Sequence, residues 1–180
     1  MVGPGRQERA WIRGAQSGSA SDLEALFREH WPRAHRAAFL VVQDTAAAED
    51  IAQEAFVAAV RNLDRFDRRR PFAPWLHRIV VNRAIDWARA RTLRRETGEV
   101  EVGDEEFDTG DLGNPFSEGI AAGLASLRPE QRAVIVLRYL LEYSPGEIAE
   151  LLDLPRGTVN SRLRRGLDRL EDILDRERAH

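Results

Sequence analysis

Apolar residues recur along this chain at the three- and four-residue spacing of amphipathic helices, and no long run alternates as a β-strand would. In the first half, Ser21 and Glu24 form a capping box, which predicts that a helix begins there. The same spacing predicts helices over 46–63 and 74–92 and a shorter one around Arg9–Ala15. Because alanine, leucine, glutamate and arginine dominate, we expect an all-α fold.

The segment 46–63 has an apolar and a polar face on a 3.6-residue wheel. Its expected core stripe consists of Ala52, Phe56, Ala59, Val60 and Leu63. The opposite, solvent-facing side carries Asp50, Gln53 and Glu54. The segment 74–92 should start after Pro74 and bury four apolar residues: Leu76, Ile79, Val80 and Ala84.

The second half of the chain predicts four more helices. Their expected ranges are Glu118–Leu127, Pro129–Leu141, Pro145–Leu152 and Arg156–Leu174. Pro129 and Pro145 suit the first turn of a helix, where the missing N–H costs nothing. Ser144 stands three residues before Glu147, which predicts a second capping box.

Residues 96–117 separate the two helical halves and differ from them in composition. They contain four glycines, a proline and eight acidic residues, and no basic one. Such a segment buries too little apolar surface to offset its chain entropy, and its like charges repel. We therefore expect two small domains, an N-terminal helical bundle and a C-terminal helix-turn-helix, joined by a flexible acidic linker. The expected boundaries are 1–20 for an N-terminal arm with a short helix, 21–95 for the bundle, 96–117 for the linker and 118–176 for the C-terminal domain.

The composition excludes several classes of function. The chain has no cysteine, so it has no disulfide, thiolate metal site or cysteine nucleophile. No apolar run approaches the roughly 18 residues that span a bilayer, and the N-terminus has no apolar signal core, so we expect a cytoplasmic protein without membrane insertion. His30 and His35 are five residues apart and suit no shared metal. Without a nucleophile–base set or a phosphate-binding glycine loop, we expect no enzymatic activity, cofactor or small-molecule substrate.

The net charge of −3 hides a strong segregation of charge along the chain. Residues 65–95 contain ten arginines against only Asp67 and Asp86. Because screening confines charge interactions to roughly 8–10 Å, such a block can bind nucleic acid even in a net acidic protein. The loop 64–74, DRFDRRRPFAP, combines four of these arginines with two phenylalanines.

The stretch 143–170 predicts two short helices separated by a turn. Its second helix carries polar side chains outside the apolar stripe, namely Arg156, Asn160, Ser161, Arg164 and Arg165. Such side chains can bond base edges or phosphates. The pattern alone leaves two interpretations open, a helix-turn-helix that reads DNA and a plain helical hairpin with a solvated basic face.

Three ordered motifs together resemble one known family. They are EDIAQEAF at 49–56, PFAPWLHRIVVNRAID at 71–86 and GEIAELLDLPRGTVNSRLRRG at 146–166. Their order and separation resemble the bacterial RNA polymerase sigma factors, and more narrowly the small extracytoplasmic-function (ECF) type, which keeps only the second and fourth conserved regions. The likeness extends over about residues 8–174.

The resemblance implies roles for particular residues of this chain. The family docks on the β′ coiled coil of RNA polymerase through positions that match Asp50, Gln53 and Glu54. Its second region opens and holds the promoter −10 element, and the matching residues here are Phe66, Arg68, Arg69, Arg70, Phe72, Arg78, Asn82, Arg83 and Arg89. Its fourth region reads the −35 element, and the matching residues here are Arg156, Thr158, Asn160, Ser161, Arg164 and Arg165.

The expectation is thus a transcription initiation factor without catalysis of its own. Its implied partners are core RNA polymerase, through the β′ coiled coil and the β subunit, promoter DNA, and an anti-sigma factor of the kind common in the family. The rival is a helix-turn-helix regulator that binds an operator as a dimer, which explains 144–170 but leaves EDIAQEAF and the arginine loop unused. A third alternative is an interaction protein that does not bind DNA.

Some of these residues also have a purely structural interpretation. Trp75 lies at helical spacing from Ile79, which favours the core over base stacking. Phe66 and Phe72 could equally anchor the arginine loop or contact DNA. Gly166 stands where the family often has alanine, and a glycine there should weaken the second helix of the hairpin by up to about 1 kcal/mol.

Overall fold

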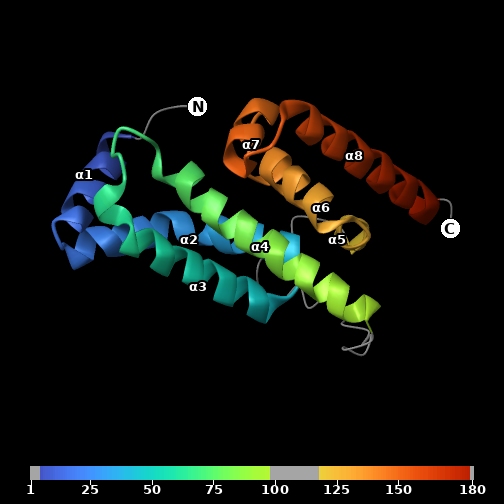
Figure 1. Cartoon of the computed structure of the whole chain (residues 1–180), viewed down its shortest axis with the longest axis horizontal. Coiled ribbons are helices and arrows are strands. Elements are labelled where there is room, and N and C mark those ends of the chain that lie inside the picture. Colours follow the sequence, from blue (N-terminus) through green and yellow to red (C-terminus); the bar gives the residue numbers. More distant parts are fainter. Residues whose placement is uncertain (1–4, 98–117, 179–180) are drawn as a thin grey trace.

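The computed structural model describes residues 5–97 and 118–178, and the regular secondary structure of these residues is all helical, without a strand (Figure 1). The N-terminal half contains α1 (Arg6–Gln16), α2 (Ala20–Val42), α3 (Thr45–Arg61), the 3-10 turn η1 (Leu63–Arg65) and α4 (Phe72–Glu96). The C-terminal half contains α5 (Glu118–Ala125), α6 (Pro129–Ile135), the π-helical turn η2 (Val136–Leu140), α7 (Pro145–Leu152) and α8 (Arg156–Arg178). The all-α prediction is confirmed. The expected flexible linker lies, apart from Glu96 and Thr97, outside the described residues.

The first long helix begins earlier than its sequence suggested. Ser19, with extended backbone, caps α2 by accepting a hydrogen bond from the backbone N–H of Asp22 at 3.3 Å. The predicted capping box of Ser21 and Glu24 is therefore wrong. Gly18, at φ +87°, makes the turn between α1 and α2. The residue that follows it, Ser19, is therefore the cap of α2.

Helices α2, α3 and α4 form the N-terminal bundle, and most of the expected core positions lie inside it. In α3, Ala52 and Ala59 are fully buried, whereas Val60 is 42% exposed and does not belong to the core stripe. In a straight helix, residues seven apart do not point in quite the same direction, so an apolar stripe rotates slowly around the helix. The neighbouring helices cover only one side of α3, and Val60 lies outside the covered side. Helix α4 begins at Phe72, two residues before Pro74, and Ile79 is only half-buried.

The N-terminal arm fixes the arginine loop onto this bundle. Ile12 of α1 is fully buried. The side-chain amide of Gln16 donates to the backbone carbonyls of Leu63 and Phe66, at 2.9 and 3.0 Å. These two bonds hold the start of the loop, so α1 is part of the bundle and not a free arm.

Both helices of the C-terminal hairpin begin where predicted, but α8 runs on to Arg178, past its expected end at Leu174, and Gly166 in α8 has a packing role. Ser144 and Glu147 form the expected capping box at the start of α7. Asp153, in the left-handed conformation at φ 54°, ends that helix. A Cβ on the buried Gly166 would lie 2.7 Å from Cδ1 of Ile135, so the glycine lets α8 approach α6 closely. The lower helix propensity of glycine, which was expected to weaken α8, thus accompanies a close contact between α8 and α6.

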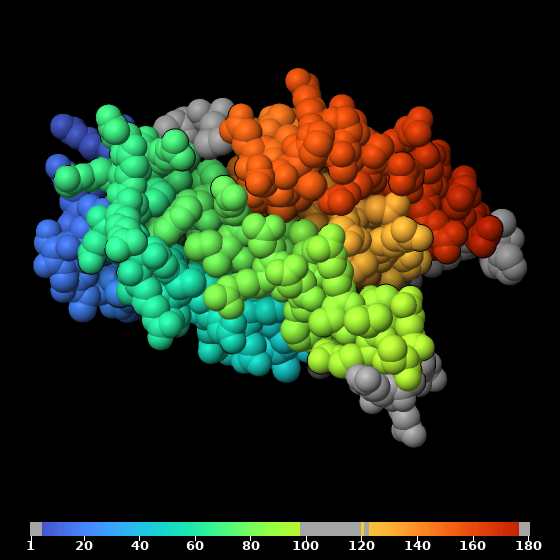
Figure 2. All heavy atoms as spheres, viewed as in Figure 1, coloured from blue at the N-terminus to red at the C-terminus, as the bar shows by residue number. Residues whose placement is uncertain are grey.

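The two halves pack against each other and share one apolar core. The C-terminal half lies along α2 and α4, and Figure 2 shows the surfaces of α7 and α4 in contact. At the junction, the buried guanidinium of Arg132 donates from Nη1 to the carbonyl of Val41 at 2.6 Å. Its Nη2 donates to the carbonyls of Ala125 and Leu127, at 3.1 and 2.9 Å.

Arg132 lies where the C-terminal ends of two helices meet. Val41 is in the last turn of α2 and Ala125 is the last residue of α5, so both present carbonyls that lack intrahelical partners. The negative ends of the two helices favour a cation there. Burial lowers the pKa of Arg132 to about 10, which leaves it charged at neutral pH. A backbone carbonyl of the N-terminal half, that of Val41, therefore binds the charged Arg132 of the C-terminal half.

We expect the start of α3 to depend on Asp44. Its carboxylate accepts from the backbone N–H of Ala47 at 2.8 Å and from Arg91 of α4 at 2.9 Å. Asp44→Ala removes the cap and should lower the unfolding free energy by about 1 kcal/mol or more in urea titrations. Asp44→Asn keeps a side-chain oxygen that can cap the helix, so its unfolding free energy should fall by less. Equal losses in the two variants would show that the cap contributes nothing.

Candidate nucleic-acid interface

A cavity of about 890 Å³ lies where the arginine loop and α4 face α7. One wall carries Arg65, Arg70 and Arg78 from the N-terminal half. The opposite wall carries Glu147 and Glu150 from α7. Three further polar residues, Asn62, Asp67 and Tyr143, also line it. The rest of the lining is apolar, namely Ala58, Phe66, Pro71, Pro74, Trp75, Ile79 and Leu151. The cavity thus has a mainly basic side from the N-terminal half and an acidic side from α7.

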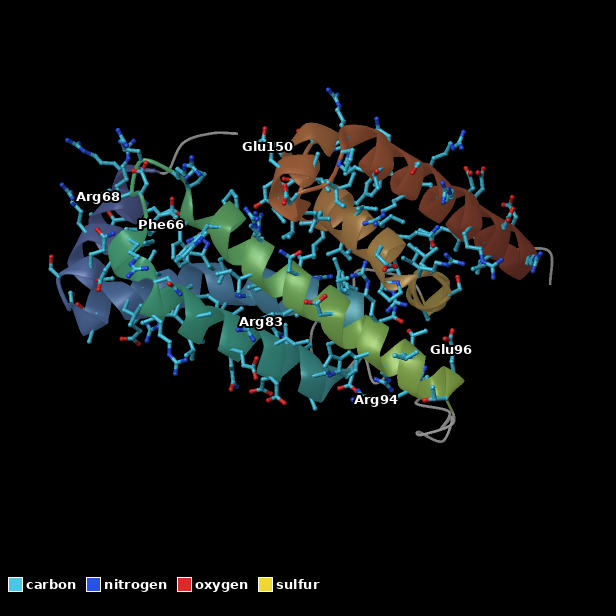
Figure 3. The ribbon with its side chains drawn as sticks, in the orientation of Figure 1. Phe66, Arg68, Arg83, Arg94, Glu96 and Glu150 are labelled. Atoms are coloured by element: carbon cyan, nitrogen blue, oxygen red, sulfur yellow. The ribbon has the colours of Figure 1, made fainter. Side chains whose placement is uncertain are left out.

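The three consecutive arginines of the loop are exposed and extend from the end of the bundle. Figure 3 shows Arg68 pointing away from the molecule, beside Phe66. Arg69 donates to the carboxylate of Asp67 at 3.0 Å, and this hydrogen bond holds the pKa of Asp67 below its usual value. The loop therefore offers cations suited to phosphate.

Helix α4 continues the basic surface, but two of the arginines that the sequence assigned to the −10 element, Arg83 and Arg89, have carboxylate partners. Arg78 and Asn82 are exposed. Arg83 donates to Glu54 of α3, so the structure brings together residues that the sequence analysis placed in two separate sites (Figure 3). Arg89 donates to Glu130 of α6. Burial opposes ionisation of Glu130, yet its hydrogen bond from Arg89 lowers the pKa on balance.

The two phenylalanines of the arginine loop are core residues in this structure. Phe66 and Phe72 are 9% and 3% exposed. Their rings pack against each other and against Trp75, with centroids 4.6 Å apart for Phe66 and Trp75. The geometry therefore supports the anchoring interpretation over contact with DNA for these rings. Trp75 is half-buried and lines the cavity.

The polar face of α3 is exposed as predicted, and an apolar extension was missed. Asp50, Gln53 and Glu54 all face solvent. Val57 and Val60 follow them one and two turns along and are 48% and 42% exposed. Residues three and four apart share a helix face, so the polar and apolar groups form one mixed stripe. The spacing of Val57 from Gln53 was the signal that could have revealed it.

The predicted recognition face of α8 is open. Arg156, Asn160, Arg164 and Arg165 are exposed. Thr158 and Ser161 are half-buried, and the hydroxyl of Ser161 donates to the backbone carbonyl of Thr158 at 3.0 Å. These two residues therefore support the helix start, and the four exposed ones form the surface that a duplex could meet.

Beneath the cavity, His77 of α4 meets Tyr143 of the C-terminal half. Nδ1 of the imidazole lies 2.8 Å from the tyrosine hydroxyl, and the two are hydrogen-bonded. Burial, with His30 and Arg33 nearby, lowers the pKa of His77 to about 3. Burial also raises the pKa of Tyr143. Both groups are neutral at physiological pH, so this contact between the halves is uncharged.

Comparisons with known proteins give the family. Residues 26–94 match the family model described as Sigma-70 region 2, and residues 117–170 match the one described as Sigma-70, region 4. The "ECF RNA polymerase sigma factor SigW" of Bacillus subtilis is 31% identical over 173 residues, with 86% of this chain and 88% of that protein covered. This chain belongs to the ECF sigma factors.

A further relative agrees in sequence, and two solved structures agree in fold. The "ECF RNA polymerase sigma factor SigL" of Mycobacterium tuberculosis is 35% identical over 158 residues, covering 86% of this sigma factor and 89% of the relative. The structure of CnrH in complex with the cytosolic domain of CnrY matches with a TM-score of 0.69 at 29% identity, covering 94% of this chain and 97% of that one. The sigma factor RpoE from Bartonella quintana, solved with the anti-sigma factor NepR, shares the fold with a TM-score of 0.71 at 22% identity, covering 87% and 98%.

Among the described residues of this sigma factor, no helix is long and apolar enough to cross a bilayer. Within the same residues, no group of three or more His, Cys, Asp or Glu side chains is placed to hold a metal ion.

The buried His77 makes the sigma factor sensitive to acid. Between its ordinary pKa of 6.5 and its folded-state value of about 3, the unfolded chain binds a proton that the folded chain does not. Stability should therefore fall as pH drops through this window, by at most about 1.4 kcal/mol per pH unit. His77→Gln keeps a polar partner for Tyr143 and removes the titration. Urea unfolding at about pH 7 and about pH 5 should show a smaller loss for the variant, and parallel losses would contradict this assignment.

Proposed function

We propose that this protein binds core RNA polymerase and directs it to promoters that have a −10 and a −35 element. One observation carries the proposal: a single chain of the sigma family has three different exposed surfaces. They are a mixed polar and apolar stripe on α3, an arginine-rich surface on the loop and α4, and an open recognition helix. Each surface suits a different partner. The catalysis of RNA synthesis would be the polymerase's, and the protein would act in the cytoplasm, where that enzyme works.

The stripe of α3 is the surface for polymerase. Asp50, Gln53 and Glu54 offer acceptors and a negative charge to a basic partner, which steers association and sets register. Val57 and Val60 add exposed apolar area next to them. An interface core that is apolar with a polar rim is the usual composition of a specific protein contact.

The arginine loop and α4 are the surface for the −10 element. Opening a duplex exposes a single strand whose phosphates need cations and whose bases need ring faces. Arg68, Arg70 and Arg78 supply the cations, and Trp75 is the aromatic ring that both borders the cavity and is partly exposed. Phe66 and Phe72 would hold the loop in shape from below.

The first turns of α8 are the surface for the −35 element. Arginine bonds guanine bidentately and asparagine bonds adenine in the major groove. Arg164, Arg165 and Asn160 are exposed on the same helix as Arg156, so they can enter a groove together. The remaining alternative, an operator-binding dimer, gives no role to the exposed stripe of α3.

The proposal is tested by run-off transcription with purified core polymerase, with and without this chain, on promoter fragments from the source genome. Initiation at defined sites only when the chain is present is the expected result. Binding of a dimer to duplex DNA with no effect on polymerase would favour the regulator and contradict the sigma assignment.

The polymerase surface predicts a loss of binding without a loss of fold. Gln53→Ala with Glu54→Ala should reduce affinity for core polymerase about tenfold or more, because it removes acceptors from the centre of the stripe. Glu171→Ala with Asp172→Ala, at the exposed far end of α8, serves as the control for removal of surface charge. Affinity is measured by titration of labelled protein, and circular dichroism checks the fold. Equal affinities of both variants and the wild type would refute the docking surface.

The recognition helix predicts a promoter-dependent loss. Arg165→Ala should weaken transcription from promoters that rely on their upstream element by about 1–3 kcal/mol if the guanidinium reads a base. Arg169→Ala, one turn further along α8 and also exposed, is the matched control. A uniform loss over all upstream sequences would assign Arg165 to phosphate, and no difference from Arg169→Ala would remove it from the site.

A further inference from the structure

Helix α1 has no role in the proposed function, and it lies outside residues 26–94, which match region 2 of the family. It nevertheless packs against the end of the bundle where the chain passes from α3 to α4 (Figure 1). Its main contacts are with α2 and with η1, the turn at which the arginine loop begins. The fully buried side chain of Ile12 anchors α1 in this position.

Gln16, the last residue of α1, holds the start of the loop. Its side-chain amide donates to the backbone carbonyl of Leu63 at 2.9 Å and to that of Phe66 at 3.0 Å. A primary amide has two N–H donors, whereas an ionised glutamate of the same shape has only acceptors, so the two carbonyls require the amide. The carbonyls lie at the first residue of η1 and just after its last, so these bonds fix how the chain enters the loop.

The end of the loop is held by a second set of contacts that also reaches α1. Phe72, the first residue of α4, is 3% exposed, and its ring centroid lies 5.0 Å from that of His30 in α2. Nε2 of His30 lies 3.1 Å from a carboxylate oxygen of Glu8 in α1. The rings of Phe66 and Phe72 also pack against each other. Both ends of the loop are therefore fixed to α1, the first directly and the second through His30.

Between these ends, the hydrogen bonds of the loop are mainly its own. The carboxylate of Asp67 accepts from the backbone N–H and from the guanidinium of Arg69, each at 3.0 Å. The backbone carbonyl of Asp67 accepts from the N–H of Arg70 at 2.8 Å. Residues 68–70 are exposed. These bonds set the shape of the loop tip, but its direction relative to α4 depends on how the two ends are held.

We propose that Gln16 is a positioning residue for the −10 surface, because its amide sets the direction in which the arginine loop leaves the bundle. The inference rests on the proposed assignment of the loop and α4 to the −10 element. A single strand bound by both must meet the cations of Arg68 and Arg70 at a fixed separation from Arg78 and the ring of Trp75. A loop that is held before binding does not have to be ordered during binding, which raises the affinity for the strand.

The first test measures whether Gln16 holds the loop. Gln16→Ala removes both donors, and Gln7→Ala, at an exposed position of the same helix, is the matched control. The backbone amides of Arg65, Phe66 and Arg70 are hydrogen-bonded within the turn and the loop, so their hydrogen exchange reports its order. They should exchange faster in Gln16→Ala, while the amides of α3 and the whole of Gln7→Ala exchange as in the wild type. Unchanged exchange in the loop would overturn the inference.

The second test measures whether the held loop matters for the strand. Holoenzyme is assembled from core polymerase and each variant, and the probe is a run-off promoter fragment whose −10 segment is opened beforehand by mismatches. Gln16→Ala should bind this fragment about fivefold or more weakly, the effect of losing one to two net hydrogen bonds. Its affinity for core polymerase, and its response to substitutions in the −35 element, should match those of Gln7→Ala. Equal binding of the opened fragment by the two variants would contradict a positioning role.

A double-mutant cycle separates positioning from a general gain in stability. In a protein that carries Arg68→Ala with Arg70→Ala, two of the cations that Gln16 would position are gone. Gln16→Ala should then cause a much smaller further loss, because both changes act on the same contact with the strand. A loss that is the same in this background as in the wild type would assign Gln16 to stability alone.

A second variant covers the case in which Gln16→Ala unfolds the end of α1. Gln16→Met keeps the length of the side chain and removes only the donors, and circular dichroism checks that its helix content is unchanged. It should lose binding of the opened fragment to the same extent as Gln16→Ala. Binding equal to that of the wild type would show that the two hydrogen bonds position nothing.

The outcomes also separate this inference from the proposed function. If wild-type holoenzyme initiates and both Gln16 variants match it on the opened fragment, the positioning role is wrong and the proposed function stands. If the wild-type chain directs initiation on no fragment, or if Arg68→Ala with Arg70→Ala leaves binding of the opened fragment unchanged, the assignment of the loop to the −10 element is itself wrong.

Discussion

One buried cation joins the two halves of this molecule. Arg132 of α6 donates to the last-turn carbonyl of Val41 in α2 while also bonding the end of α5, so a charge from the C-terminal half is satisfied by backbone from both halves. A buried charge without such partners would cost several kcal/mol, which makes the relative position of α2, α5 and α6 interdependent. Because small helical domains are marginal by themselves, the shared apolar core around this arginine contributes stability that neither half has alone.

That constraint places the proposed functional surfaces. With α6 held against α2, α7 lies over the N-terminal part of α4, and Tyr143 reaches His77. The acidic wall of the cavity then follows from the position of α7. The recognition face is open because α8 packs on α5, α6 and α7, on the outer side of the C-terminal half (Figure 1). The polymerase stripe on α3 is on the side of the bundle that the C-terminal half leaves exposed. One packing arrangement therefore leaves two partner surfaces open and places α7 beside the third.

Local signals in the sequence were enough to predict most helices. The range Pro145–Leu152 and the Ser144 cap were predictable because proline, serine and glutamate act on their own turn. Long-range contacts were not predictable in this way. The hydrogen bond between His77 and Tyr143 and the pairing of Arg89 with Glu130 join residues whose sequence spacing carries no common pattern. Gly166 shows the same limit. In the sequence this glycine indicated only a weaker helix, and the closeness of Ile135 in the structure explains why a glycine stands there. The family motifs indicated the three surfaces, but not that α7 would lie beside one of them.

The central claim is that the buried Arg132 holds the two halves of this sigma factor together. It is tested most directly by energy transfer between dyes on Ala46→Cys and Asp172→Cys, exposed positions on α3 and α8 of a chain that has no other cysteine. The account predicts high transfer for the protein with Arg132 and lower transfer when Arg132→Ala removes the cation that joins the halves. Transfer that is low from the start, or that Arg132→Ala does not change, would contradict it.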